Sequence, residues 1–190
     1  AAIYYRLADL NMARKTYTVA LRVVQQGNAD RQWNVHILQR MADIDLQRLD
    51  WKQALRVYEQ IRTITPDDET TRRQLVELNL RMAQTDKALN ELESYLTYLE
   101  SQNRNDTAIA FVEDMLKEHP DQLLLKRALA TQFHHAGRIE AAISLLDVLG
   151  ETLMQSGNKQ GALEVINQIV LMNPPNVEEY RQLLFQMQSS

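Results

Sequence analysis

Paired imidazoles bind metals and transfer protons, so the four histidines are the first side chains to consider. His134 and His135 are adjacent, and on a helix their side chains would point about 100° apart. Two histidines that share a metal from one helix stand four residues apart instead. His36 and His119 lie in other parts of the chain. We therefore expect surface or packing roles for all four, and we predict no metal site.

Carboxylates are numerous, but their pattern is typical of charged helix surfaces rather than of a catalytic pair. The ones considered are Asp43, Asp45, Glu77, Glu91, Glu93, Glu113 and Asp114. General acid–base catalysis needs carboxyl groups with shifted pKa values in a dry pocket, and the sequence indicates no such pocket. The chain has no cysteine, no glycine-rich phosphate loop and no Ser–His–Asp signature. We predict that it is not an enzyme and takes no cofactor.

The overall charge of the chain also excludes several classes of partner. The formal net charge is −4, and without a basic cluster we predict no nucleic-acid binding. No apolar stretch reaches the length of a membrane span, so we predict no membrane partner. The opening AAIYYRLADL lacks the pattern of a secretory leader. We accordingly expect a cytoplasmic location.

The elements that must position these side chains are helices. Good helix formers are plentiful, and the strict alternation of a strand is absent. Over 51–65, Ala54, Tyr58 and Ile61 recur at three- and four-residue steps, which places them on one helix face. The same reasoning predicts about eleven helices, over 1–7, 10–26, 31–48, 51–65, 68–83, 86–102, 105–118, 121–136, 139–156, 159–172 and 176–188.

The helices repeat at a fixed period. Pro66, Pro120 and Pro174 are evenly spaced, and the same step separates Ala54, Ala108 and Ala162. Self-similarity at a fixed period indicates a stack of copies of one supersecondary unit. Because no composition shift divides the chain, we predict a single repeat domain over 1–190. Both ends look cut, and we interpret the chain as a fragment of a longer protein.

The segment DWKQALRVYEQIRTITPDD resembles the second half of a tetratricopeptide repeat (TPR). Its turn, small residue, aromatic and closing proline match the motif at Asp50, Trp51, Ala54, Tyr58, Ile61 and Pro66. The same register returns at Ala13, Ala88, Ala108, Ala142 and Ala162. The resemblance implies an all-α fold, a right-handed superhelical α-solenoid of TPR-like antiparallel helices.

The spacing departs from the standard repeat. The steps from Ala54 to Ala88 and from Ala108 to Ala142 match the TPR length of about 34 residues. The step from Ala88 to Ala108 is much shorter. Since one long and one short step together equal the spacing of the prolines, we infer a unit of three helices. If neighbouring helices are antiparallel, an odd number per unit would place Pro66 and Pro120 at opposite edges of the stack.

The resemblance also implies a binding surface, because in TPR folds the first helix of each pair lines the concave face. The matching positions are His36, Gln39, Arg40, Asp43, Gln47, Arg73, Gln74, Glu77 and Arg81. An ordinary solvated face remains the alternative for each. Arg127, His134 and His135 are weaker candidates. The family's carboxylate clamp uses Lys and Asn, whereas here Gln39, Asp43 and Gln74 occupy those places, so the clamp is not implied.

The function that follows is a non-catalytic scaffold that binds a peptide or partner protein along the concave groove. Two alternatives stay open. One is a regulatory or sensory segment of a larger protein. The other is self-association through the C-terminal helix, where Phe185 and Met187 have no predicted neighbour.

Overall fold

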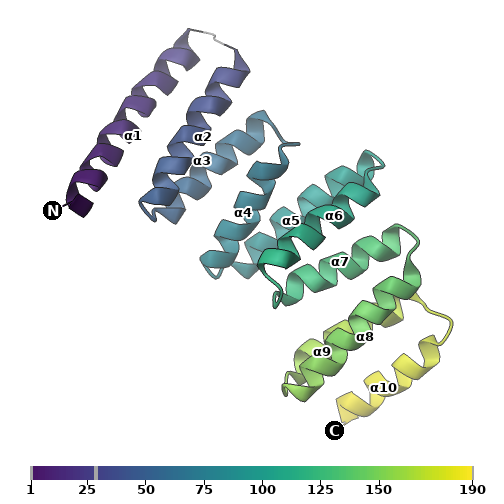
Figure 1. Cartoon of the computed structure of the whole chain (residues 1–190). Coiled ribbons are helices and arrows are strands. Elements are labelled where there is room, and N and C mark those ends of the chain that lie inside the picture. Colours follow the sequence, from purple (N-terminus) through teal and green to yellow (C-terminus); the bar gives the residue numbers. More distant parts are fainter. Residues whose placement is uncertain (1, 28–29, 190) are drawn as a thin grey trace. The chain divides into compact units, whose positions relative to one another are not determined.

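The structure is a computed structural model, and it describes residues 2–27 and 30–189. Those residues form ten helices joined by short turns, with no strand (Figure 1). The helices are α1 (Ala2–Gln26), α2 (Arg31–Gln47), α3 (Trp51–Ile64), α4 (Glu69–Arg81), α5 (Thr85–Ser101), α6 (Asn105–Glu118), α7 (Leu123–His135), α8 (Ile139–Gln155), α9 (Lys159–Met172) and α10 (Val177–Ser189). None of the described helices combines the length and apolar character needed to cross a bilayer. The all-α prediction is confirmed.

The predicted number of helices was close, and the difference lies at the start of the chain. Two helices were expected over 1–7 and 10–26, but α1 is continuous from Ala2. The intervening residues Ala8 and Asp9 include neither proline nor glycine. Without a residue that breaks the hydrogen-bond ladder, propagating a helix costs less than starting a second one.

The helix bounds repeat with the period seen in the sequence. α5, α6 and α7 have the same lengths as α2, α3 and α4, and they follow those helices at the spacing of the prolines. α8, α9 and α10 follow after one further step of the same size. The structural unit is therefore three helices long, as the spacing of the alanines predicted.

The turns repeat with the same period. Leu49, Asn103 and Gly157 share one turn position, and all three adopt positive φ, at 57°, 56° and 77°. Ala83 and Gly137 share another, with φ of 55° and 74°. Left-handed backbone costs an L-residue about 1–2 kcal/mol, except for glycine and, in part, asparagine. The turns therefore hold Leu49 and Ala83 in a backbone conformation that is unfavourable for these residue types.

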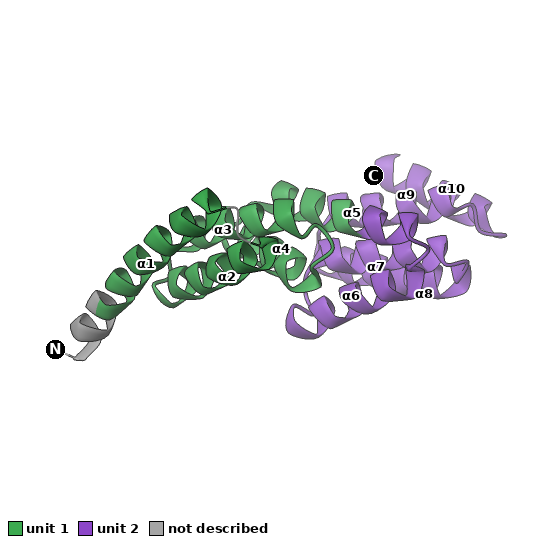
Figure 2. Ribbon diagram, turned by 90° about the horizontal axis from the view of Figure 1, so that it is seen from above, with its two compact units in different colours: residues 1–95 green, residues 96–190 purple. Residues whose placement is uncertain are grey.

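The contacts between Cα atoms divide the chain into two compact units, residues 1–95 and 96–190, and the division falls within α5 (Figure 2). In unit 1, α1 packs on α2, α2 on α3 and α3 on α4. In unit 2, the successive pairs from α6 to α10 pack in the same way. Each unit has its own apolar core. A single domain over 1–190 stays a prediction.

Small residues allow neighbouring helices to approach closely, as the repeat pattern predicted. Ala54, Ala88, Ala108, Ala142 and Ala162 are each 0% exposed. The larger apolar residues four and seven positions after each alanine are buried as well. A helix pair cannot cover its apolar side alone, so each helix of the repeat is buried by packing against the adjacent helices.

The predicted placement of Pro66 and Pro120 stays untested, because the two residues belong to different units. Within unit 2 the same reasoning applies to Pro120 and Pro174. The turn between α6 and α7 and the turn between α9 and α10 lie at opposite edges of unit 2 (Figure 1). That is the arrangement expected when three antiparallel helices separate the two turns.

A buried ion pair joins helices of unit 1. Arg72 and Glu91 are 6% and 7% exposed, and Arg72 Nη1 donates to Glu91 Oε1 at 2.7 Å. Arg72 Nε also donates to the Pro66 carbonyl at 2.8 Å, and its guanidinium lies 5.5 Å from the Tyr95 ring centroid. Arg62 contacts the same carboxylate. These contacts join α3, α4, α5 and the proline turn, and they give the buried charges the partners that burial requires.

Ala108→Leu tests the helix interface. We expect it to lower the free energy of unfolding by about 1–3 kcal/mol, because the added side chain overpacks a close contact. Ala110→Leu is the matched control, since Ala110 is exposed on the same helix. Chemical denaturation measures both. Equal small effects of the two substitutions would contradict burial of Ala108 in an interface.

A reciprocal pair tests the repeated turn. Leu49→Asn should raise the free energy of unfolding by about 1 kcal/mol, because asparagine tolerates left-handed backbone better than leucine. Leu49 is 73% exposed, so little buried apolar area is lost. Asn103→Leu should have the opposite effect at the equivalent turn. Two changes of the same sign would contradict the explanation.

Candidate functional site

The predicted binding residues of α2 and α4 line two hollows in unit 1, which we call together the α2/α4 groove. The first hollow has a volume of about 270 Å³. It is lined by His36, Gln39, Arg40, Asp43, Tyr58, Thr70 and Thr71. Tyr58 is its apolar floor, contributed by α3 and 6% exposed.

The second hollow, of about 210 Å³, lies toward the turn between α2 and α3. It is lined by Leu46, Leu49, Trp51, Gln74, Glu77, Leu78 and Arg81. The structure thus gathers six of the seven main predicted residues around two hollows, and Arg73 lines neither. Whether a partner binds in them stays a prediction.

The electrostatics of the groove centre on Tyr58. Burial raises the pKa of the Tyr58 hydroxyl to about 12, and the negative charges of Asp43, Glu77 and Asp68 contribute to the rise. These three carboxylates come from α2, α4 and the cap of α4. All three carboxylates therefore favour the protonated form of this one hydroxyl.

The arginines of the groove differ in their surroundings. Arg40 Nη1 lies 3.6 Å from an oxygen of Asp43, and both side chains are about half exposed. Such exposed pairs are weak. Arg73 pairs with Glu69 at 3.7 Å. Arg81 is exposed at the end of α4 and has no ion pair with any residue that the structure describes. The groove therefore combines a negative centre with a free positive charge at one end.

Sequence reasoning missed a larger hollow of unit 1. It has a volume of about 650 Å³ at the start of α2, and its lining includes Trp33, Val35 and Ile64. Trp33 is 60% exposed and meets the His36 ring edge-on, with the centroids 6.4 Å apart. His36 and Gln39 also line the first hollow of the groove. The tryptophan at the start of a predicted helix was the one signal in the sequence that could have indicated this hollow. Whether that tryptophan is exposed, however, depends on the tertiary structure.

Two buried carboxylates of unit 1 are engaged in structural pairs. Asp45 is 0% exposed, and both of its oxygens lie 2.9 Å from Arg14 Nε of α1. Burial raises the pKa of Asp45, and the charges of Arg14 and Arg48 oppose that shift. Glu91 is held by Arg72 as described above. Both carboxylates therefore bind neighbouring helices together.

Two of the three weaker candidates, Arg127 and His135, make polar contacts within unit 2. Arg127 of α7 donates to Glu164 and Gln168 of α9, at 2.8 and 3.1 Å. His135 Nδ1 lies 2.9 Å from Glu100 Oε1. These contacts account for both polar side chains within the unit.

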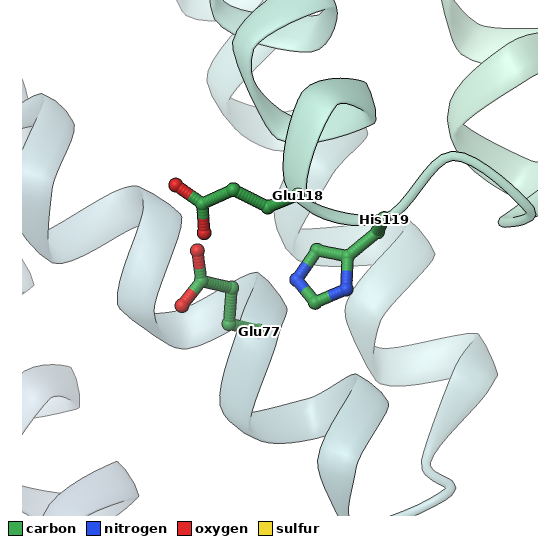
Figure 3. A group of neighbouring side chains, drawn as sticks. All are labelled: Glu77, Glu118 and His119. Carbon is green, nitrogen blue, oxygen red and sulfur yellow. The ribbon is translucent and has the colours of Figure 1, made fainter.

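Another histidine lies at the end of a helix. His119 is the residue after α6 and follows Glu118 (Figure 3). Figure 3 also labels Glu77, which belongs to unit 1, whereas Glu118 and His119 belong to unit 2. The three residues therefore belong to two units, and we assign them no common site.

The raised pKa of Tyr58 gives a pH prediction. The folded-state pKa of about 12 exceeds the ordinary value of 10.0, so the stabilising contribution is complete below pH 10 and disappears as the pH rises through about 12. Ultraviolet titration of tyrosinate should show late-titrating absorbance, and Tyr58→Phe should remove the part that titrates near pH 12. Removal of only early-titrating absorbance would contradict the raised pKa of Tyr58.

No family model and no curated protein matches this chain, whereas several solved structures do. A tetratricopeptide repeat protein from Parabacteroides merdae is 16% identical, with 98% of this chain and 81% of that chain covered and a TM-score of 0.39. A putative kinesin light chain from Podosopora anserina with nearly identical TPR-like repeats is 15% identical, with coverage of 99% and 89% and a TM-score of 0.42.

A third solved structure is YrrB, a TPR protein with an unusual peptide-binding site. It is 11% identical, with coverage of 89% and 97% and a TM-score of 0.32. The identities and TM-scores of these structures are low, so the fold class is taken from the packing of this chain itself. The regular three-helix period and the buried alanines make the chain an all-α helical repeat protein.

Proposed function

We propose that this chain is a non-catalytic scaffold that binds a peptide segment of a partner protein in the α2/α4 groove. The observation that carries the proposal is the pair of hollows between α2 and α4, over a floor whose tyrosine lies among three carboxylates. The helical-repeat fold supports a scaffold, since such folds present extended surfaces between rigid helices.

The lining indicates what the partner segment carries. A lysine or arginine fits over Tyr58, because Asp43, Asp68 and Glu77 all favour positive charge there. An apolar side chain fits the second hollow, where Leu49 is 73% exposed beside Trp51. We therefore infer a segment with one basic and one apolar anchor.

Leu49 supports the apolar anchor in a second way. It holds a left-handed backbone that Asn103 and Gly157 adopt at the equivalent turns with less strain. An exposed leucine at such a position brings no advantage to folding. Residues held in strained backbone conformations cluster at binding sites.

The engagement of two buried carboxylates supports a structural role for these two residues. Asp45 and Glu91, two buried acids of unit 1, are paired with arginines at hydrogen-bond distance. A general acid or base must instead face its substrate.

A displayed library of random peptides tests the proposal directly. Selection on the intact chain should enrich peptides that carry lysine or arginine near a large apolar residue. Asp43→Lys reverses the charge beside Tyr58 and should weaken the selected peptides at least about tenfold, measured by calorimetry.

Glu59→Lys is the matched control. Glu59 is exposed on α3 and lines neither hollow, so this variant changes the net charge equally and should leave affinity unchanged. Binding should also lower the pKa of Tyr58, because a cation then faces it. Failure to enrich any peptide, or equal loss in both variants, would reject the groove.

A further inference from the structure

Unit 2 contains a hollow at the place in the repeat that the α2/α4 groove occupies in unit 1. α8, α9 and α10 stand two periods of the repeat after α2, α3 and α4. The hollow lies between α8 and α10 over α9 and has a volume of about 410 Å³, and we call it the α8/α10 hollow. That volume is within the range of pockets that hold ligand groups.

The chemistry of this hollow differs from that of the groove in unit 1. Its floor is aliphatic, formed by Leu146, Ile166 and Ile169, which are 0%, 5% and 0% exposed. At the position of Tyr58 in unit 1, unit 2 has Ile166. Met154 and Leu183 form part of the walls and are 47% and 41% exposed. The hollow is therefore open and apolar within.

Two carboxylates stand on one wall. Asp147 and Glu151 both line the hollow and are four residues apart on α8, so they share one helix face. The Tyr180 hydroxyl of α10 donates to Asp147, with both oxygens at 3.0 Å. Burial, together with Asp147, raises the pKa of Tyr180.

Neither carboxylate has a cationic partner among the residues that the structure describes. Like charges at this spacing repel each other in the empty state. A cation placed between them would remove that repulsion, and the apolar floor would bury a side chain next to it.

We propose that the α8/α10 hollow is a second docking site, which takes a partner segment carrying a leucine- or methionine-sized side chain next to a lysine or arginine. The apolar floor binds the first side chain and the two carboxylates bind the second. The site lies wholly in unit 2, so it does not depend on the α2/α4 groove.

Methionine-methyl NMR of the intact chain provides the test. Met154 and Met187 line the hollow, whereas Met12, Met41, Met82, Met115 and Met172 do not and serve as internal controls. Three synthetic peptides of one length serve as probes: a leucine–lysine peptide, its leucine–glutamate counterpart and its serine–lysine counterpart. Only the leucine–lysine peptide should shift Met154 and Met187 at a given concentration.

Matched charge variants complete the test. Asp147→Asn combined with Glu151→Gln should weaken the leucine–lysine peptide about tenfold or more, while asparagine still accepts the Tyr180 hydrogen bond. Glu93→Gln combined with Glu113→Gln removes the same charge from exposed positions outside the hollow and should have no effect.

Four results would overturn the proposal. One is the absence of any shift at Met154 and Met187 with the leucine–lysine peptide. A second is an equal shift with the serine–lysine peptide, and a third is equal weakening by both pairs of variants. The fourth is a shift of these methyl signals with protein concentration alone, which would identify a second copy of the chain as the occupant.

Discussion

The close approach of neighbouring helices at buried alanines is the contact on which the structure depends. Ala54, Ala108 and Ala162 occupy the same place in successive three-helix units, and each is fully buried. A small side chain there lets the helices come near, and the larger residues one and two turns on then fill the space between them. Because no helix buries its apolar side alone, each such contact also fixes the position of the next helix.

Because packing at the alanines holds the helices together, the residues that line the hollows can differ between repeats. Tyr58 and Ile166 are equivalent in the repeat, yet one lies among carboxylates and the other forms an aliphatic floor. Packing constrains both to be large and buried, but it does not constrain the residues around them. A repeated frame can therefore present chemically unlike hollows, as it does in α2/α4 and α8/α10.

Some residues are poor choices for folding and good choices for recognition. Leu49 takes a left-handed turn that asparagine and glycine take elsewhere in the repeat, and its side chain stays exposed. Asp147 and Glu151 repel each other across one turn of α8. By contrast, Asp45 and Glu91 are neutralised inside the fold by arginines. The strained leucine and the two repelling carboxylates line hollows, whereas the carboxylates paired with arginines lie between packed helices.

The sequence by itself determined the features that repeat. Helix periodicity, the small residue at each interface and the proline and polar turns all recur with one period, and the structure confirms them at the same spacing. The grouping of Asp43 with Glu77 could be predicted as well, since both follow the repeat register. Only the tertiary structure decided the continuity of α1, the exposure of Trp33 and the pairing of Tyr180 with Asp147. These depend on how separate helices approach one another, and neighbours in space that lie far apart along the chain leave no local pattern in the sequence.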